Sequence, residues 1–111
     1  MKTVTDPFYT SQRWRHLREA VLRRDGYVCQ IAKRTKLLPE PAGIVHHIFP
    51  RDIFPEYQWQ PWNLISVSVA AHNRLHDRNT DQLTEEGMAL LIRTARKRGM
   101  DLNAIRERLD R

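Results

Sequence analysis

The chain has only one cysteine, Cys29, in 111 residues. A single cysteine cannot form an internal disulfide, which excludes a disulfide-stapled scaffold and fits a reducing compartment. No apolar run approaches the roughly 20 residues that a transmembrane helix needs, and the opening MKTVTDPFYT lacks the apolar core of a signal peptide. We therefore expect a soluble, cytoplasmic protein that does not bind membranes.

Acidic residues are also in the minority. The chain contains 19 Lys and Arg against 13 Asp and Glu, which gives a formal charge of +6. A small basic domain attracts polyanions, and the phosphate backbone of a nucleic acid is the usual one. The length, with 41% apolar residues, suffices for one domain with a modest core.

Four of the five histidines lie between Val45 and Arg78, as an adjacent pair and a spaced pair. Adjacent residues of an extended segment point to opposite faces, so His46 and His47 cannot do the same job there. His72 and His76 are four apart, which places both imidazoles on one face of a helix. The pattern predicts that His46, His72 and His76 act together as three neutral ligands and leave His47 for proton transfer.

Three imidazoles with an open fourth position form a catalytic metal site rather than a closed structural one. A divalent ion there can hold a phosphate oxygen and stabilise charge on a leaving group. We expect His47 to take a proton from water, and Asn63 to hold its far ring nitrogen with an amide oxygen. Imidazoles suit zinc or nickel, while magnesium or manganese could support activity, so the identity of the single ion stays open.

Capping residues and prolines divide the chain into short elements. Thr10 or Ser11 can begin one helix, and Ser68 is suited to cap the helix that carries the spaced histidines. Thr84 and Asp101 can begin two more helices before the end of the chain. The predicted elements are an irregular lead-in over residues 1–9, a helix over about 11–24, a short strand over 27–31, strands over 44–49 and 64–67, the histidine helix, and helices over about 84–110.

In these features the chain resembles the HNH endonucleases, whose core is a metal finger of two strands and a helix. The resemblance extends from about Trp14 to Asp77, through WRHLREAVLRRDGYVCQ, VHHIFP, NLISV and HNRLHD. It implies a small α+β fold in which residues 1–111 form one nuclease domain. The ββα-metal core is expected at about 44–78, with the N-terminal helix at about 11–24 and the C-terminal helices at about 84–110.

The resemblance also implies a role for each residue of the motif. His47 is similar to the general base of the family, Asn63 to the residue that orients it, and His72 to a metal ligand. Many members have Asp at the position of His46. The double histidine, with His76 one turn after His72, is more similar to the colicin-type nucleases, in which all three such histidines bind the ion. Similar small proteins often occur in phage and prophage contexts.

One departure concerns a second metal. Many small HNH proteins carry two CxxC pairs that hold a structural zinc, and the corresponding positions here are Cys29, Ala32, Ser68 and Ala71. Only one thiolate remains, so we predict that this zinc site is absent. Apolar packing must then hold the scaffold together.

The function that these features predict is metal-dependent hydrolysis of phosphodiester bonds in DNA, with RNA as an alternative substrate. We expect phosphate contacts from basic residues of the first helix and from one arginine after the histidine strand, namely Arg13, Arg15, Arg18 and Arg51. The helix arginines could equally form a solvated face. The alternative function is a non-catalytic nucleic-acid-binding module with a closed structural zinc site, which would have no use for His47. The oligomeric state stays open.

Overall fold

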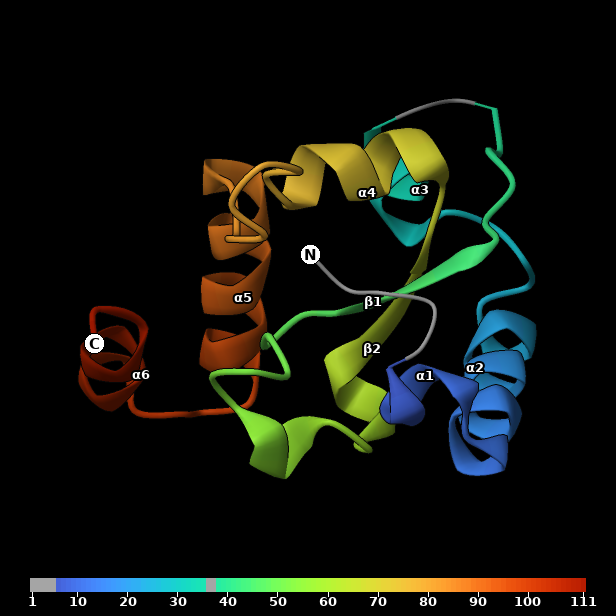
Figure 1. The fold of residues 1–111 in the computed structure, drawn as a ribbon. Coiled ribbons are helices and arrows are strands. Elements are labelled where there is room, and N and C mark those ends of the chain that lie inside the picture. Colours follow the sequence, from blue (N-terminus) through green and yellow to red (C-terminus); the bar gives the residue numbers. More distant parts are fainter. Residues whose placement is uncertain (1–5, 36–37) are drawn as a thin grey trace.

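The computed structural model describes residues 6–35 and 38–111 and has the expected α+β architecture (Figure 1). The helices and strands, in chain order, are α1 (Pro7–Thr10), α2 (Gln12–Arg24), α3 (Gln30–Thr35), β1 (Ile44–His47), β2 (Leu64–Val67), α4 (Val69–Leu75), α5 (Glu85–Lys97) and α6 (Leu102–Leu109), with short 3-10 turns at Pro55–Tyr57 and Pro61–Asn63. None of the helices in the described part of the chain is long and apolar enough to cross a membrane.

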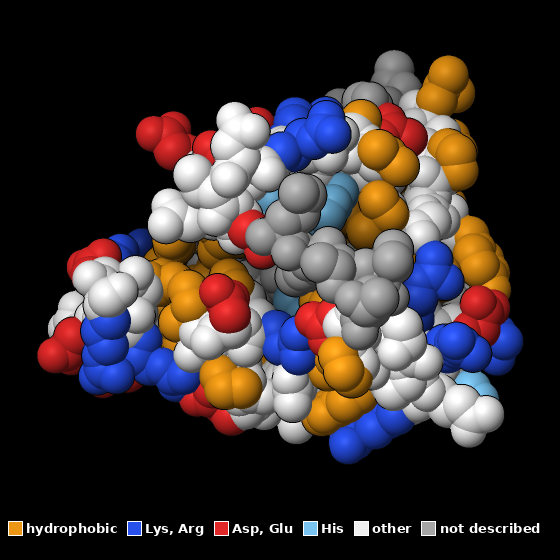
Figure 2. Space-filling view, viewed as in Figure 1, with side chains coloured by type: hydrophobic (Ala, Val, Ile, Leu, Met, Phe, Trp, Pro, Cys, Tyr) orange, Lys and Arg blue, Asp and Glu red, His pale blue; other side chains and the backbone are white. Residues whose placement is uncertain are grey.

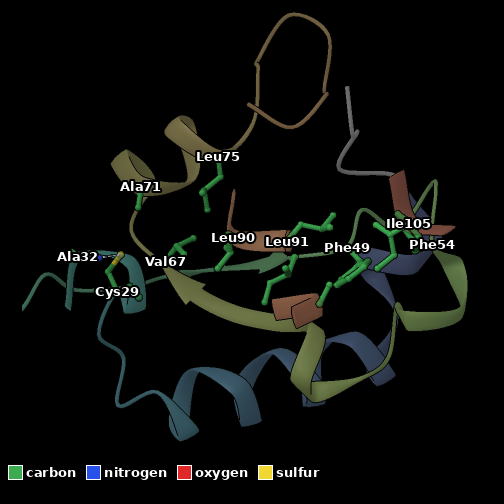
Figure 3. Close-up of a cluster of buried hydrophobic side chains, with 13 residues drawn as sticks. Cys29, Ala32, Phe49, Phe54, Val67, Ala71, Leu75, Leu90, Leu91 and Ile105 are labelled. Carbon is green, nitrogen blue, oxygen red and sulfur yellow. Dashed lines mark hydrogen bonds between the residues drawn. The ribbon is translucent and has the colours of Figure 1, made fainter. Parts of the chain in front are cut away.

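The two strands form an antiparallel hairpin in the middle of the molecule, with helices on both sides (Figure 1). The register pairs Ile44 with Val67 and His47 with Leu64. Because side chains alternate between the faces of a strand, the hairpin separates two apolar clusters. Val45 and Leu64 pack with residues of α1 and α2, while Val67 packs with residues of α3, α4 and α5 (Figure 3).

Helix capping follows the sequence closely. The Ser11 hydroxyl accepts the N–H of Trp14 at 3.1 Å, which begins α2. Ser68 begins α4 in the same way, and Thr84 begins α5. Each cap satisfies a backbone donor that the first helical turn cannot pair internally. These predicted helix starts are confirmed.

Two predicted elements are wrong. Residues 27–31 do not form a strand, because Val28 makes only an isolated bridge to Pro41 and α3 begins at Gln30. Proline has no N–H for a ladder, so the potential partner segment cannot extend the pairing. The lead-in also contains a helical turn, α1, which Asp6 caps and Pro7 begins. Residues 1–5 of the predicted lead-in lie outside the described residues.

The C-terminal end of α2 is tied to β2 by the Asp25 carboxylate. It accepts the N–H of Ser66 at 3.0 Å and the Arg24 guanidinium at 2.9 Å, and Arg24 also donates to the Leu64 carbonyl at 2.7 Å. Burial would raise the pKa of Asp25, but these hydrogen bonds outweigh it and hold the pKa below its ordinary value. The ionised carboxylate therefore stabilises the fold at neutral pH, and this contribution is lost as the pH falls through the lowered pKa.

The last metal-site histidine lies just beyond a helix rather than within one. Helix α4 ends at Leu75, and His76 has an extended backbone with φ −122° and ψ 138°. Its N–H still bonds the His72 carbonyl at 3.2 Å, and it makes an isolated bridge to Leu83 across the turn that follows. The expectation that both histidines lie on the helix is wrong for His76, which is positioned by the turn and by the packing of α5.

The four positions at which the sequence predicts no structural zinc lie together in the core. Cys29, Ala32 and Ala71 are fully buried (Figure 3), and Ser68 is nearly so. The N–H of Ala32 approaches the Cys29 sulfur at 3.5 Å. Burial raises the pKa of the thiol, but hydrogen bonds from Ala32 and Ser68 outweigh it, so the pKa is lowered. The alanine methyl groups thus add to the apolar cluster.

Cys29→Ser is expected to fold and to keep the full metal content of the parent, because the other three positions supply no thiolate. Elemental analysis of the purified variant and parent checks this. Loss of one metal equivalent would show that Cys29 belongs to a second site.

Gly87→Ala is expected to destabilise the fold and to weaken metal binding. A Cβ at Gly87 would lie 2.3 Å from the backbone oxygen of Leu75, the residue before His76. Such overpacking costs about 1–3 kcal/mol, more than the gain of up to about 1 kcal/mol that alanine brings to a helix. Gly43→Ala is the control, since its Cβ would meet nothing within 4 Å. Equal urea midpoints for the two variants would contradict the prediction.

Candidate active site

Three histidines from separate parts of the metal finger come together. His46 lies in β1, His72 in α4 and His76 immediately after α4. One ring nitrogen from each lies within 4.8 Å of the other two, and the ring centroids are 5.0–5.7 Å apart. His46 is only 1% exposed, and His72 is half-buried. The structure therefore brings together the three residues that the sequence predicted as ligands.

The donor set fits a divalent ion. Tetrahedral zinc has Zn–N bonds of about 2.0–2.1 Å, which places its nitrogen ligands roughly 3.4 Å apart. The three ring nitrogens all lie within 4.8 Å of one another, a range that includes this separation. An Asp81 oxygen also lies 3.9 Å from Nδ1 of His76. Carboxylates beside ligating imidazoles commonly orient the ring. The sequence did not predict this contact of Asp81, because no local signal indicates the turn that brings Asp81 close to His76.

His47 points to the opposite face, toward α1 and α2. Its ring stacks on Trp14, with centroids 5.3 Å apart and planes 18° apart, and Phe8 and Tyr9 pack around it. Its Nε2 lies 3.0 Å from the backbone carbonyl of Gln58. A carbonyl oxygen can only accept a hydrogen bond, so Nε2 carries the proton and Nδ1 keeps the lone pair of the neutral ring.

The predicted contact of Asn63 with the His47 ring is wrong. Its amide oxygen accepts the N–H of Phe49 at 2.7 Å, and its amide nitrogen donates to the carbonyls of Phe49 and Tyr57 at 3.2 and 3.1 Å. Strand alternation explains the difference. Leu64, the partner of His47, faces α2, so the residue before it faces the other way. Asn63 therefore braces the loop between the strands, and a backbone carbonyl, which has no sequence signal, holds the His47 ring.

Two of the clustered histidines and His47 line the same cleft. A hollow of about 260 Å³ runs along β1 and is lined by His46, His47 and His72, with Tyr9, Trp14 and Arg18 at its wall. His46 and His47 project from opposite faces of β1, yet both line this hollow, so side chains from the two faces reach the same opening. A substrate atom in this cleft lies beside the metal-binding cluster and beside the ring of His47.

The predicted phosphate-binding arginines have different surroundings. Arg18 lines the cleft and donates to the Gly43 carbonyl at 2.5 Å. Arg13 lies 4.1 Å above the Trp59 ring and Arg15 is exposed. Arg51 instead pairs with Asp6 at 2.6 Å, which ties the loop after β1 to α1. The structure thus supports Arg18 as a cleft residue more directly than Arg51.

Comparison with known proteins gives one informative match. No protein-family model and no curated protein sequence matches the chain. A crystal structure of the HNH endonuclease of the deep-sea thermophilic bacteriophage GVE2, with a manganese ion, is similar to it with a TM-score of 0.58 and 39% sequence identity. The alignment covers 60% of this chain and 72% of that one. On this likeness, and with its strand–strand–helix finger and histidine cluster, the chain belongs to the HNH endonuclease family.

Proposed function

We propose that the protein is a metal-dependent endonuclease that hydrolyses phosphodiester bonds of DNA with His47 as general base. His46, His72 and His76 hold a single divalent ion. The observation that carries the proposal is the single cleft lined by His46, His47 and His72. The phage relative was crystallised with manganese, which makes manganese the first ion to test and supports a phage or prophage origin.

His46, His72 and His76 would hold the ion, which would supply Lewis-acid chemistry for a phosphate oxygen and the leaving 3′ oxygen. The protein's own groups supply the proton transfer. Nδ1 of His47 takes a proton from the attacking water while Gln58 retains the proton on Nε2. Trp14 fixes the plane of the ring by stacking. Asn63 acts at a distance, because its amide nitrogen donates to the carbonyl of Tyr57 and so holds the loop that presents the neighbouring Gln58 carbonyl.

Electrostatics support a nucleic-acid substrate. The formal charge is +6, and groups of Lys and Arg side chains are spread over the face on which histidine side chains are visible (Figure 2). Such a surface binds the phosphate backbone without reading base sequence. Arg18 is placed to contact a phosphate in the cleft, with Arg13 and Arg15 farther along α2. DNA is the proposed substrate and RNA is the alternative.

The competing function, a module with a closed structural zinc site, has one observation in its favour. Asp81 lies 3.9 Å from His76 and could approach as a fourth ligand. That arrangement leaves the His47 ring, held by Gln58 and Trp14 in the same cleft, without a role. A catalytic site uses every one of these residues.

Separate alanine substitutions of the two adjacent histidines distinguish the general base from the metal ligand. His47→Ala is expected to keep its manganese and to cut supercoiled plasmid about 10²–10⁴-fold more slowly, the usual contribution of a general base. His46→Ala is expected to lose metal affinity and to recover partly at high manganese concentration. Metal content and gel assays with and without a chelator measure both effects. If His47→Ala loses the ion while His46→Ala keeps it, the two assignments are reversed.

Asn63→Ala tests the indirect role of the amide. The side chain is fully buried and its three hydrogen bonds all go to backbone groups, so its removal leaves buried groups unpaired. We expect the free energy of unfolding to fall by about 2–4 kcal/mol, with a smaller loss of cleavage than in His47→Ala. Asn103→Ala, at an exposed position of α6, is the control. Unchanged stability with strongly reduced cleavage would mean that Asn63 acts on the ring directly.

A further inference from the structure

A second hollow, of about 770 Å³, lies between α3, α5 and the hairpin and is bordered by four cations. Its wall includes Arg34 of α3, Arg93 and Lys97 of α5, and Arg98 at the end of α5. All four are exposed. Its floor is largely apolar and includes Ile48, Ile65 and Trp62. We call this hollow the α5 groove.

The cations of the α5 groove are not neutralised within the described part of the chain. Arg24, Arg51 and Arg108 each pair with a carboxylate, whereas no ion pair among the described residues involves the groove cations. Among the residues that the structure describes, no Asp or Glu lines the groove. Partial burial, together with the charge of Arg34, lowers the pKa of Arg93. Four like charges gathered in this way create a local field that an anionic ligand would relieve.

The groove also differs from an ordinary solvated helix end. Basic residues favour the last turn of any helix, and this accounts for Lys97 and Arg98. It also accounts for Arg34, which lies in the last turn of α3. It does not account for Arg93, one turn earlier in α5, or for the meeting of two helix ends at one hollow. The Arg98 guanidinium lies 4.0 Å above the Trp62 ring, which holds its charge at the wall of the groove.

The position of the groove relates it to the metal site. Ile65 pairs with His46 across the hairpin, and Ile48 lies two residues after His46, about 7 Å farther along the chain. The Ile48 N–H bonds the Asn63 carbonyl at 2.8 Å, so the ladder continues to this point. Alternation places both isoleucines on the face from which His46 projects. The groove therefore continues the surface of the metal-binding cluster.

We infer that the α5 groove binds the sugar–phosphate backbone of the nucleic-acid strand that flanks the cleavage point, with Arg34, Arg93 and Lys97 on its phosphates. The inference rests on the proposed function and adds to it a second contact surface besides α2. The alternating charge and apolar surface of a nucleotide strand match a groove with a basic rim and an apolar floor. An acidic polypeptide is the alternative occupant.

The test compares two triple variants, both in the 111-residue His47→Ala chain loaded with manganese. The groove variant is Arg34→Gln, Arg93→Gln and Lys97→Gln, which leaves the Arg98–Trp62 contact intact. The control variant is Arg96→Gln, Arg106→Gln and Arg111→Gln, three exposed residues outside the groove with the same change in charge. Fluorescence anisotropy with a labelled DNA duplex of about 20 base pairs gives the affinity as a function of salt.

Each phosphate contact contributes about 0.9 to the slope of log affinity against log salt. The slope of the groove variant is therefore expected to fall by about 2–3, and its affinity at low salt by at least about tenfold. The slope of the control variant is expected to fall by less than about 1. Equal changes in the two variants overturn the inference. So does a groove variant that binds DNA like the control but no longer binds poly-glutamate, because the occupant is then an acidic polypeptide.

Failure of the inference and failure of the proposed function are distinguishable in the same experiments. If the unsubstituted chain cuts plasmid and the two triple variants bind DNA alike, only the groove assignment is wrong. If the unsubstituted chain neither cuts nor binds, the proposed function fails and the groove assignment fails with it.

A second measurement does not depend on folding of the groove variant. Amine acetylation of the His47→Ala chain, read by mass spectrometry with and without duplex DNA, reports the accessibility of single lysines. Lys97 is expected to become protected, while Lys33, exposed on α3 outside the groove, reacts at the same rate in both conditions. Lys97 reacting equally with and without DNA overturns the inference.

Discussion

The division of labour in this site depends on the alternation of side chains along one short strand. His46 and His47 are neighbours in β1 and project to opposite faces of the hairpin. His46 lies on the face that packs against α4 and α5, and His47 lies on the face that packs against α1 and α2. A slip of one residue would exchange them, because the side-chain period of a strand is two. Polar contacts fix the register from both ends. Asp25 holds Ser66 on β2, and Asn63 holds the backbone of Phe49 just beyond β1.

Apolar packing gives this hairpin its support. The four positions compared with a zinc site in the sequence analysis lie in the core, and Cys29 carries the one thiol among them. Helix α5 contributes Leu90 and Leu91 to the same cluster, and α6 adds Ile105 (Figure 3). This packing also reaches the metal site, since α5 meets the end of α4 beside His76. Stability and metal binding are therefore coupled through the same contacts.

Local signals in the sequence were sufficient for much of this fold. Caps such as Ser68 and the alternation that separates His46 from His47 act within a few residues, so they can be read directly. What sequence analysis missed depends on segments far apart in the chain. The Gln58 carbonyl and the pairing of Arg51 with Asp6 arise only when loops meet in three dimensions. The expected strand at 27–31 failed for the same reason, because its partner segment contains prolines.

The central claim is that one divalent ion binds three histidines while the adjacent His47 stays outside its coordination sphere. Anomalous diffraction from crystals grown with manganese tests it most directly, because the signal locates the ion independently of the protein chain. We expect one strong peak, bonded to nitrogen atoms of His46, His72 and His76, with His47 still bound to the Gln58 carbonyl. A peak bonded to His47, or one that is absent from this cluster, would contradict the account.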